Sequence, residues 1–259
     1  MTTRRVPTRL LIPAILALGF LLIPLIALVV RAPWRHLGTQ LRGTDVLTAL
    51  RLSIECASIA TAISLLVGVP LAWVLARVEF PGRSVVRALV TLPLVLPPVV
   101  GGVALLLGFG RTGFIGHALS DAGISLPFST AGVVVAETFV AMPFLVVAVE
   151  GALLASDTRY DEAAATLGAT PWFTFWRVTM PLVLPGVLAG SALCWARALG
   201  EFGATITFAG NLPGTTQTMP LAVYLTLQND PDAAIVLSLL MLAVSVAVLV
   251  GLRGRWIRP

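Results

Sequence analysis

The sequence predicts an all-α membrane protein with six transmembrane helices. Of its 259 residues, 58% are hydrophobic and 11% are charged, whereas soluble domains have about 45–50% apolar and about 25% charged residues. Five runs without a charge are 19 to 23 residues long, and about 20 apolar residues cross a hydrocarbon core of about 30 Å. This composition excludes a water-soluble enzyme and a disordered chain.

The charge-free runs and one further apolar segment define six predicted spans. The first run is too long for the apolar region of a signal peptide and has no clear cleavage site, so we interpret it as an uncleaved helix. A sixth span is apolar except for Glu137 and completes the set. In chain order, the predicted spans are Leu10–Val30, Cys56–Ala76, Ala88–Gly110, Ser129–Glu150, Val178–Ala196 and Ala233–Leu252.

Small residues and prolines predict how these spans pack. The second span repeats a small residue every four positions from Cys56 to Ala76, and the fifth carries Gly186 and Gly190. This spacing lets helix backbones approach closely. The third span contains Pro97 and Pro98, so we expect a kinked or broken helix, which lines a translocation path or is a bent packing helix.

The basic residues predict the orientation of the chain. All 17 are arginines, and with the N-terminus inside, 11 fall on inner segments and 4 on outer ones, which favours both termini in the cytoplasm. The four outer arginines are Arg31, Arg35, Arg42 and Arg111. We expect three parts: residues 1–45 with the first helix and outer loop, 46–252 with five helices, and a short cytoplasmic tail, 253–259.

Two absences limit the chemistry that the chain performs. Without a lysine the chain has no Walker A loop, so it does not hydrolyse ATP by that route. The cysteines, Cys56 and Cys194, both lie in apolar runs without metal-ligand spacing, and no disulfide scaffold follows from them.

The inner segment around residues 156–181 has the signals of a compact helix-turn-helix. Asp157, Asp161 and Glu162 favour a helix N-terminus, and Gly168 is placed for a left-handed C-terminal cap. Thr170 then resembles an N-cap, with proline at the first position of a second helix. Two helix caps in one connection indicate a structured segment, and we expect a cytoplasmic partner to bind it.

This segment resembles the EAA loop of ABC-importer permeases. Glu162-Ala163-Ala164, Gly168 after three residues and Pro181 at the end of Val178-Thr179-Met180-Pro181 follow the family spacing, with valine and methionine where the family has isoleucine and leucine. The resemblance implies the type I ABC-importer transmembrane fold and a coupling helix, Glu162 to Gly168, seated in a cleft of a separate ATPase subunit. It further implies a multi-pass subunit in the cell membrane of a prokaryote, with no cofactor of its own.

Two later stretches narrow the resemblance. Arg197 to Ala204 is similar to the sulfate and molybdate subfamily, and Phe208 to Leu221 is most similar to molybdate permeases. The resemblance implies import of molybdate or tungstate by a homodimer, fed by an extracytoplasmic molybdate-binding protein. A sulfate or thiosulfate permease remains the alternative.

Several candidate residues admit two interpretations. Arg197 and Glu201 are spaced for a local ion pair, and together with Phe202 they are candidates for a gate at the outer end of the path. The four outer arginines either pair with carboxylates of a binding protein or are scattered solvated charges.

A secondary transporter is a competing function class. It would have midplane ionisable residues and inverted repeats, and neither is evident in the sequence.

Overall fold

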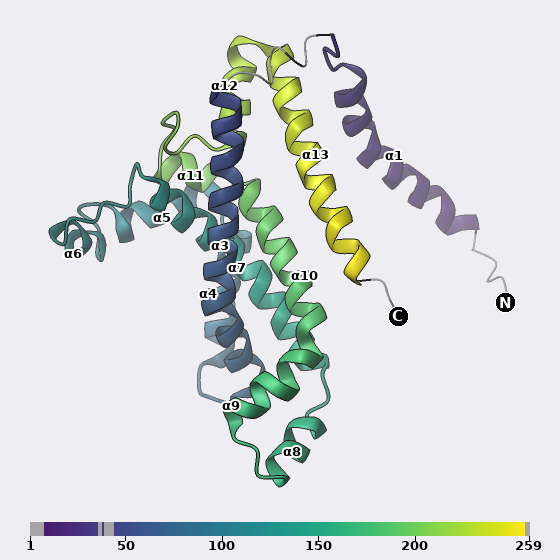
Figure 1. The fold of residues 1–259 in the computed structure, drawn as a ribbon, viewed down its shortest axis with the longest axis vertical. Helices are drawn as coiled ribbons and strands as arrows, with labels where there is room; N and C mark the ends of the chain where they lie inside the picture. The colour runs from purple at the N-terminus through teal and green to yellow at the C-terminus, as the bar shows by residue number, and fades with distance from the viewer. Residues whose placement is uncertain (1–7, 36–37, 39–43, 257–259) are drawn as a thin grey trace.

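The computed structural model describes residues 8–35, 38 and 44–256, and the described elements are helices joined by short connections (Figure 1). In chain order they are α1 (Thr8–Val30), α3 (Thr44–Arg77), α4 (Arg83–Val95), α5 (Pro98–Phe109), α6 (Gly116–Asp121), α7 (Thr130–Ala155), α8 (Arg159–Thr166), α9 (Pro171–Thr174), a π-helical turn η1 (Phe175–Thr179), α10 (Met180–Leu199), α11 (Gly203–Phe208), α12 (Met219–Asn229) and α13 (Pro231–Trp256).

Five continuous helical segments in the described chain are long and apolar enough to cross a membrane, and α4 with α5 makes a sixth if that bent pair is one span. The predicted all-α class is confirmed. The continuous spans are Leu10–Val30, Asp45–Arg77, Thr130–Ala155, Pro171–Leu199 and Pro231–Val248.

The third predicted span is broken, as its prolines indicated. Its halves, α4 and α5, are bent by 119° relative to each other. Pro97 and Pro98 each disfavour helical backbone at the residue before them, and Leu96 is extended at φ −64° and ψ 133°. Pro98 then takes the first position of α5, where its missing N–H costs nothing.

The fifth span begins earlier than the charge-free run predicts. One helical segment runs from Pro171 through η1 to Leu199, so the second helix of the predicted helix-turn-helix is the start of the span itself. In η1 the Met180 N–H donates to the carbonyl of Phe175, five residues back. This wider turn directly precedes Pro181, whose ring clashes with a carbonyl four residues earlier in a regular α-helix.

Helices α3, α7 and α10 form the buried centre of the molecule. The small-residue face of α3 is buried against α7: a Cβ atom on Gly68 would lie 3.3 Å from Cγ2 of Val146. On α10, a Cβ on Gly186 would overlap the Cβ of Ala152, and one on Gly190 would lie 3.0 Å from the Cβ of Ala148. Close contact holds membrane helices together because lipid tails are as apolar as the side chains.

The remaining elements surround this bundle (Figure 1). Helices α5, α6 and α11 extend to one side, and α1 lies beside α13 on the other. The apolar residues of α1 are not buried within the chain. Helix α8 is at one end of the bundle and α12 is at the other. We refer to these as the α8 end and the α12 end.

Helices α11 and α12 fall in a stretch to which no span was assigned. Glycines allow α11 to contact α5: a Cβ on Gly102 would lie 2.6 Å from the Cβ of Thr207, and one on Gly203 would lie 2.7 Å from the Cβ of Pro98. Ser53 of α3 fixes α12, since its hydroxyl accepts the Met219 N–H at 2.7 Å.

Candidate functional site

The α8 end presents a short helix with defined caps. The Asp157 carboxylate accepts the Arg159 N–H at 3.0 Å as α8 begins. After α8, Gly168 has φ +81° and donates its N–H to Ala165, while the Ala169 N–H reaches the carbonyl of Ala164. These two bonds form a Schellman motif, and the predicted left-handed cap is confirmed.

The following helix begins as its sequence signals predict. The Thr170 hydroxyl accepts the Phe173 N–H at 3.3 Å, and Pro171 occupies the first helical position. The cap fixes the direction in which the chain leaves the turn after Gly168, and therefore the angle between α8 and the fifth span.

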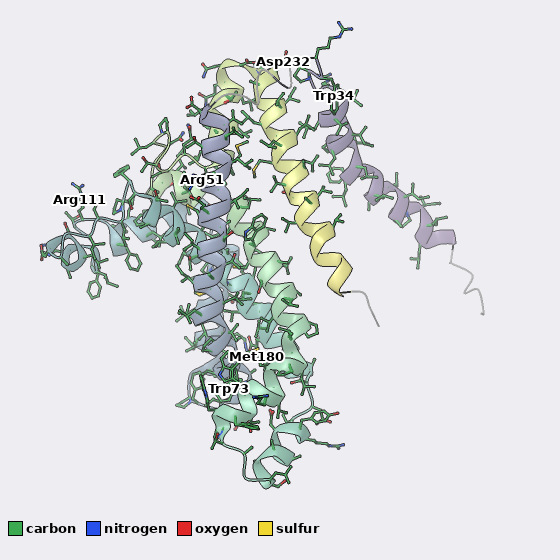
Figure 2. All side chains as sticks on the ribbon, in the orientation of Figure 1. Trp34, Arg51, Trp73, Arg111, Met180 and Asp232 are labelled. Atoms are coloured by element: carbon green, nitrogen blue, oxygen red, sulfur yellow. The ribbon has the colours of Figure 1, made fainter. Side chains whose placement is uncertain are left out.

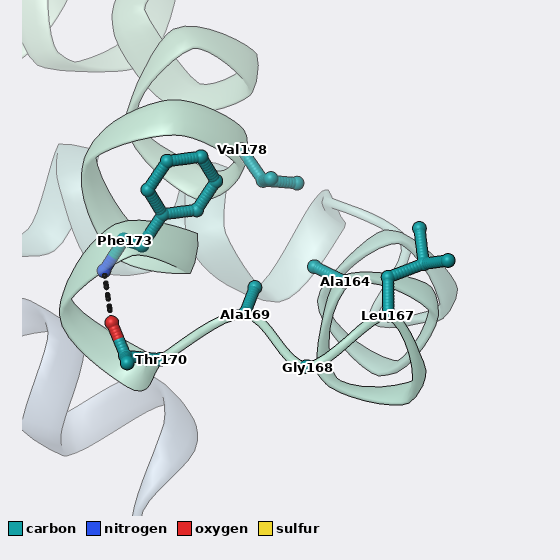
Figure 3. Close-up of a pocket in the computed structure, with 7 residues that line it drawn as sticks. All are labelled: Ala164, Leu167, Gly168, Ala169, Thr170, Phe173 and Val178. Atoms are coloured by element: carbon teal, nitrogen blue, oxygen red, sulfur yellow. Dashed lines mark hydrogen bonds between the residues drawn. The ribbon is translucent and has the colours of Figure 1, made fainter.

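An apolar notch of about 500 Å³ lies between α8 and the start of this span. Figure 3 shows Ala164 and Leu167 on one side of it and Phe173 and Val178 on the other. Leu167 is 87% exposed and Phe173 is 53% exposed. Large exposed apolar side chains around a concave surface mark an interaction site. The complete lining is Ala164, Leu167, Gly168, Ala169, Thr170, Phe173 and Val178.

The residues expected to contact an ATPase occupy this end of the molecule. Glu162 and Ala163 are exposed on α8, Ala164 is half-buried in the notch, and Gly168 caps the helix. Pro181 is separate from them, in the first turn of α10.

A polar network that the sequence did not reveal joins α8 to the bundle. Asp161 Oδ1 accepts a hydrogen bond from the Thr179 hydroxyl at 2.8 Å, and its Oδ2 lies 3.6 Å from Nη2 of Arg77. Arg77 also donates to the Ser156 hydroxyl at 2.7 Å. In the sequence Asp161 is only a favourable charge in the first helical turn, and nothing in its spacing indicates Thr179 or Arg77 as a partner.

Arginines at the α8 end make internal bonds as well. Arg83 Nε donates to the carbonyl of Leu75 at 2.7 Å, near the end of α3. Arg87 Nε donates to Glu150 of α7 at 2.8 Å, and its Nη2 reaches the same Leu75 carbonyl at 3.3 Å. These side chains satisfy carbonyls that the helix end leaves without a partner.

The three gate candidates lie where α10, α11 and α12 meet. Arg197 Nη1 is 2.5 Å from Oε2 of Glu201, whose side chain is 1% exposed, and Glu201 Oε1 accepts the Ala204 N–H at 2.8 Å. The Phe202 ring packs on Tyr224 of α12 with centroids 5.1 Å apart. One carboxylate therefore both pairs with α10 and caps α11.

A second buried acid, Glu137, lies inside the bundle on α7 with 1% exposure. Its position agrees with the expectation that acids at membrane depth face the interior. Its Oε2 has no hydrogen-bond partner among the described residues. Within the same described part of the chain, no three His, Cys, Asp or Glu side chains gather as a metal site would require.

The three predicted outer arginines that the structure describes do not form one patch. Arg31 and Arg35 are exposed after α1, whereas Arg111 lies on the other side of the bundle near α6, where it donates to the Ser125 hydroxyl at 3.4 Å. Figure 2 shows this separation through Arg111 and Trp34, the neighbour of Arg35 in the chain. Arg42 lies outside the described residues.

Known proteins are similar to this chain in sequence and in fold. The chain is 51% identical over 246 residues to the molybdenum transport system permease protein ModB of Mycobacterium tuberculosis, which covers 94% of this chain and 92% of the relative. It is 36% identical over 233 residues to the sulfate transport system permease protein CysT of Escherichia coli, covering 88% and 84%.

The fold is similar to that of a bacterial ABC transporter involved in the import of the polysaccharide alginate, with a TM-score of 0.77, 18% identity and coverage of 97% of this chain and 96% of that one. Residues 68–259 match the family described as the binding-protein-dependent transport system inner membrane component. With its membrane helices and its capped α8 loop, the chain belongs to this family of transport permeases.

Proposed function

We propose that this chain is the membrane-spanning permease subunit of an ATP-driven importer of molybdate, with tungstate as a closely similar substrate. The observation that carries the proposal is the 51% identity to a molybdenum permease over 94% of the chain, against 36% over 88% for a sulfate permease. Sulfate or thiosulfate import is the alternative that the experiment below separates.

ATP is hydrolysed in this proposal by a separate subunit that binds the α8 end. The chain contains no lysine for a Walker A loop, and its capped helix leaves Glu162 and Ala163 exposed beside an apolar notch. Such a notch suits an apolar side chain of the ATPase, and Glu162, exposed on the same helix, suits a basic partner.

In this assignment the chain lies in the cell membrane of a prokaryote, and the α8 end and both termini are on the cytoplasmic side. Two copies of the chain line one path, and an extracytoplasmic molybdate-binding protein docks at the α12 end, with Arg31, Arg35, Arg42 and Arg111 as candidate contacts. ATP binding closes the ATPases, moves the two α8 helices together and opens the path outward. Arg197, Glu201 and Phe202 are the candidate gate, which is supported by their contacts between three helices around one buried carboxylate.

The test is uptake of labelled molybdate in cells that lack their own oxyanion importers. The chain is co-expressed with its candidate ATPase and binding protein, with excess sulfate as competitor. We expect uptake that resists sulfate and is lost in Glu162→Arg and in Gly168→Arg. Glu79→Arg is the matched control, because Glu79 is an exposed acid in the α3–α4 connection, outside the notch.

The possible outcomes separate the alternatives. Uptake that sulfate competes away would leave the mechanism in place and change the substrate to sulfate. Uptake that needs no ATPase and survives both substitutions would contradict the importer assignment and favour a secondary transporter.

A further inference from the structure

The carboxylate of Asp161 contacts two elements besides its own helix. Its Oδ1 accepts the Thr179 hydroxyl at 2.8 Å in the π-helical turn, and its Oδ2 lies 3.6 Å from Arg77 at the last residue of α3. Both partners are largely buried: Thr179 is 3% exposed, and the Arg77 side chain is 14% exposed. Asp161 therefore points inward from a helix whose next residue, Glu162, is exposed.

Arg77 extends this contact to a third helix. Its Nη2 donates to the Ser156 hydroxyl at 2.7 Å, and this hydroxyl donates to the Leu153 carbonyl at 2.8 Å, at the end of α7. Through one aspartate and one arginine, α8 is linked to the ends of α3 and α7 and to the start of the fifth span. These are the three elements that build the buried centre.

The partner of Asp161 on the fifth span lies in its least regular turn. Thr179 ends η1, two residues before Pro181, and its hydroxyl also lies 3.5 Å from the Thr174 carbonyl. Single π turns within helices are rare and occur frequently at functional sites. A widened turn before a proline is a place where the span changes direction with little loss of hydrogen bonding.

The notch separates α8 from the rest of this segment. Ala164 and Leu167 face Phe173 and Val178 across about 500 Å³ of open volume, so side-chain packing is sparse there (Figure 3). A displacement of α8 is thus passed on chiefly through its covalent ends and through Asp161.

We propose that Asp161 is the positioning residue through which a force on α8 enters the bundle, by way of Thr179 in the π turn and Arg77 at the end of α3. The inference rests on the proposed function, since it requires an ATPase that moves α8. Glu162 and its exposed neighbours contact the ATPase, while Asp161 on the inner face of the same helix transmits the movement.

The test uses the full complex, reconstituted in lipid vesicles with its ATPase and binding protein. Three quantities are measured: co-purification of the ATPase, ATP hydrolysed, and molybdate transported. We expect Asp161→Ala and Thr179→Val to lower the molybdate transported per ATP about tenfold, the effect of losing one hydrogen bond to a charged group. Co-purification should stay at the wild-type level, because the exposed face of α8 is unchanged.

Two matched controls separate this role from a general loss of structure. Thr179→Ser keeps the hydroxyl and should restore the wild-type ratio of transport to hydrolysis. Glu79→Ala removes an exposed acid in the α3–α4 connection, outside α8 and its caps, and it should leave the ratio unchanged. The double variant Asp161→Ala with Thr179→Val should lose no more than Asp161→Ala alone, because Thr179 acts through Asp161.

Several results of the same experiment would contradict the inference. A wild-type ratio in both Asp161→Ala and Thr179→Val would overturn the inference, and so would an additive loss in the double variant. Loss of ATPase co-purification in both would instead assign Asp161 to the fold or the docking surface. A wild-type complex without ATP-driven uptake would overturn the proposed function itself, and the inference with it.

Discussion

Gly186 sets the distance between two membrane helices through the methyl group that it lacks. A Cβ at this position would overlap the Cβ of Ala152 on α7, one turn from the similarly close approach of Gly190 to Ala148. Because hydrocarbon solvates apolar side chains as well as a neighbouring helix does, the stability of α7 on α10 depends on contact at short range.

We therefore predict that Gly186→Ala destabilises the protein by about 1–3 kcal/mol, the usual cost of overpacking a close contact. The measurement is the thermal unfolding midpoint of the detergent-solubilised chain. Gly151→Ala on α7 is the control, because a Cβ there has no atom within 4 Å. Equal midpoints for the two variants would show that α7 and α10 do not approach as described.

At the scale of elements, the turn between α8 and α9 depends on backbone conformation rather than on space. Gly168 has φ +81°, yet a Cβ there would meet no atom within 4 Å. The left-handed region costs residues with a side chain roughly 1–2 kcal/mol, whereas asparagine enters it more readily than branched residues do.

We predict that Gly168→Asn keeps the turn and that Gly168→Val loses roughly 1–2 kcal/mol of local stability. In the purified chain, proteolytic cleavage between α8 and α9 should be faster for the valine variant, with wild-type and asparagine variants alike. If valine and asparagine behaved identically, backbone conformation would not be the reason for glycine at this position.

At the scale of the whole molecule, the arginines of the α8 end have two roles. In the proposed orientation they are inner-segment charges, which favour retention of that end in the cytoplasm. Arg77, Arg83 and Arg87 also bond to the ends of helices, so they stabilise the bundle in addition to orienting it. The same side chains therefore contribute both to the proposed orientation and to the stability of the proposed ATPase-binding surface.

The proposed orientation predicts a labelling pattern in intact cells. A membrane-impermeant maleimide should label Thr112→Cys, near α6, without permeabilisation, and Thr166→Cys, on α8, only after it. Both native positions are exposed, and the native Cys56 and Cys194 are fully buried, so the unmodified chain supplies a low background. The reverse pattern would place α8 outside and exclude the proposed assembly.

The sequence by itself predicts the features that depend on residues close together in the chain. Hydropathy and charge define six spans, because a hydrocarbon core demands about 20 apolar residues whatever the fold. Gly168, Thr170 and Pro171 define the caps of the α8 loop, since each acts within four residues of the chain. Pro97 and Pro98 indicate the break between α4 and α5 for the same reason.

Only the tertiary structure decided which distant groups meet. The Asp161–Thr179 bond, the ion pair of Arg87 with Glu150 and the packing of α5 on α11 join residues whose separation along the chain carries no periodic signal. The early start of the fifth span was also hidden, because Arg177 interrupts the charge-free run although it lies within the continuous helix. Interactions between residues close in the chain determine caps, breaks and spans. Contacts between helices depend on the whole bundle, which must pair its buried polar groups and leave little empty space.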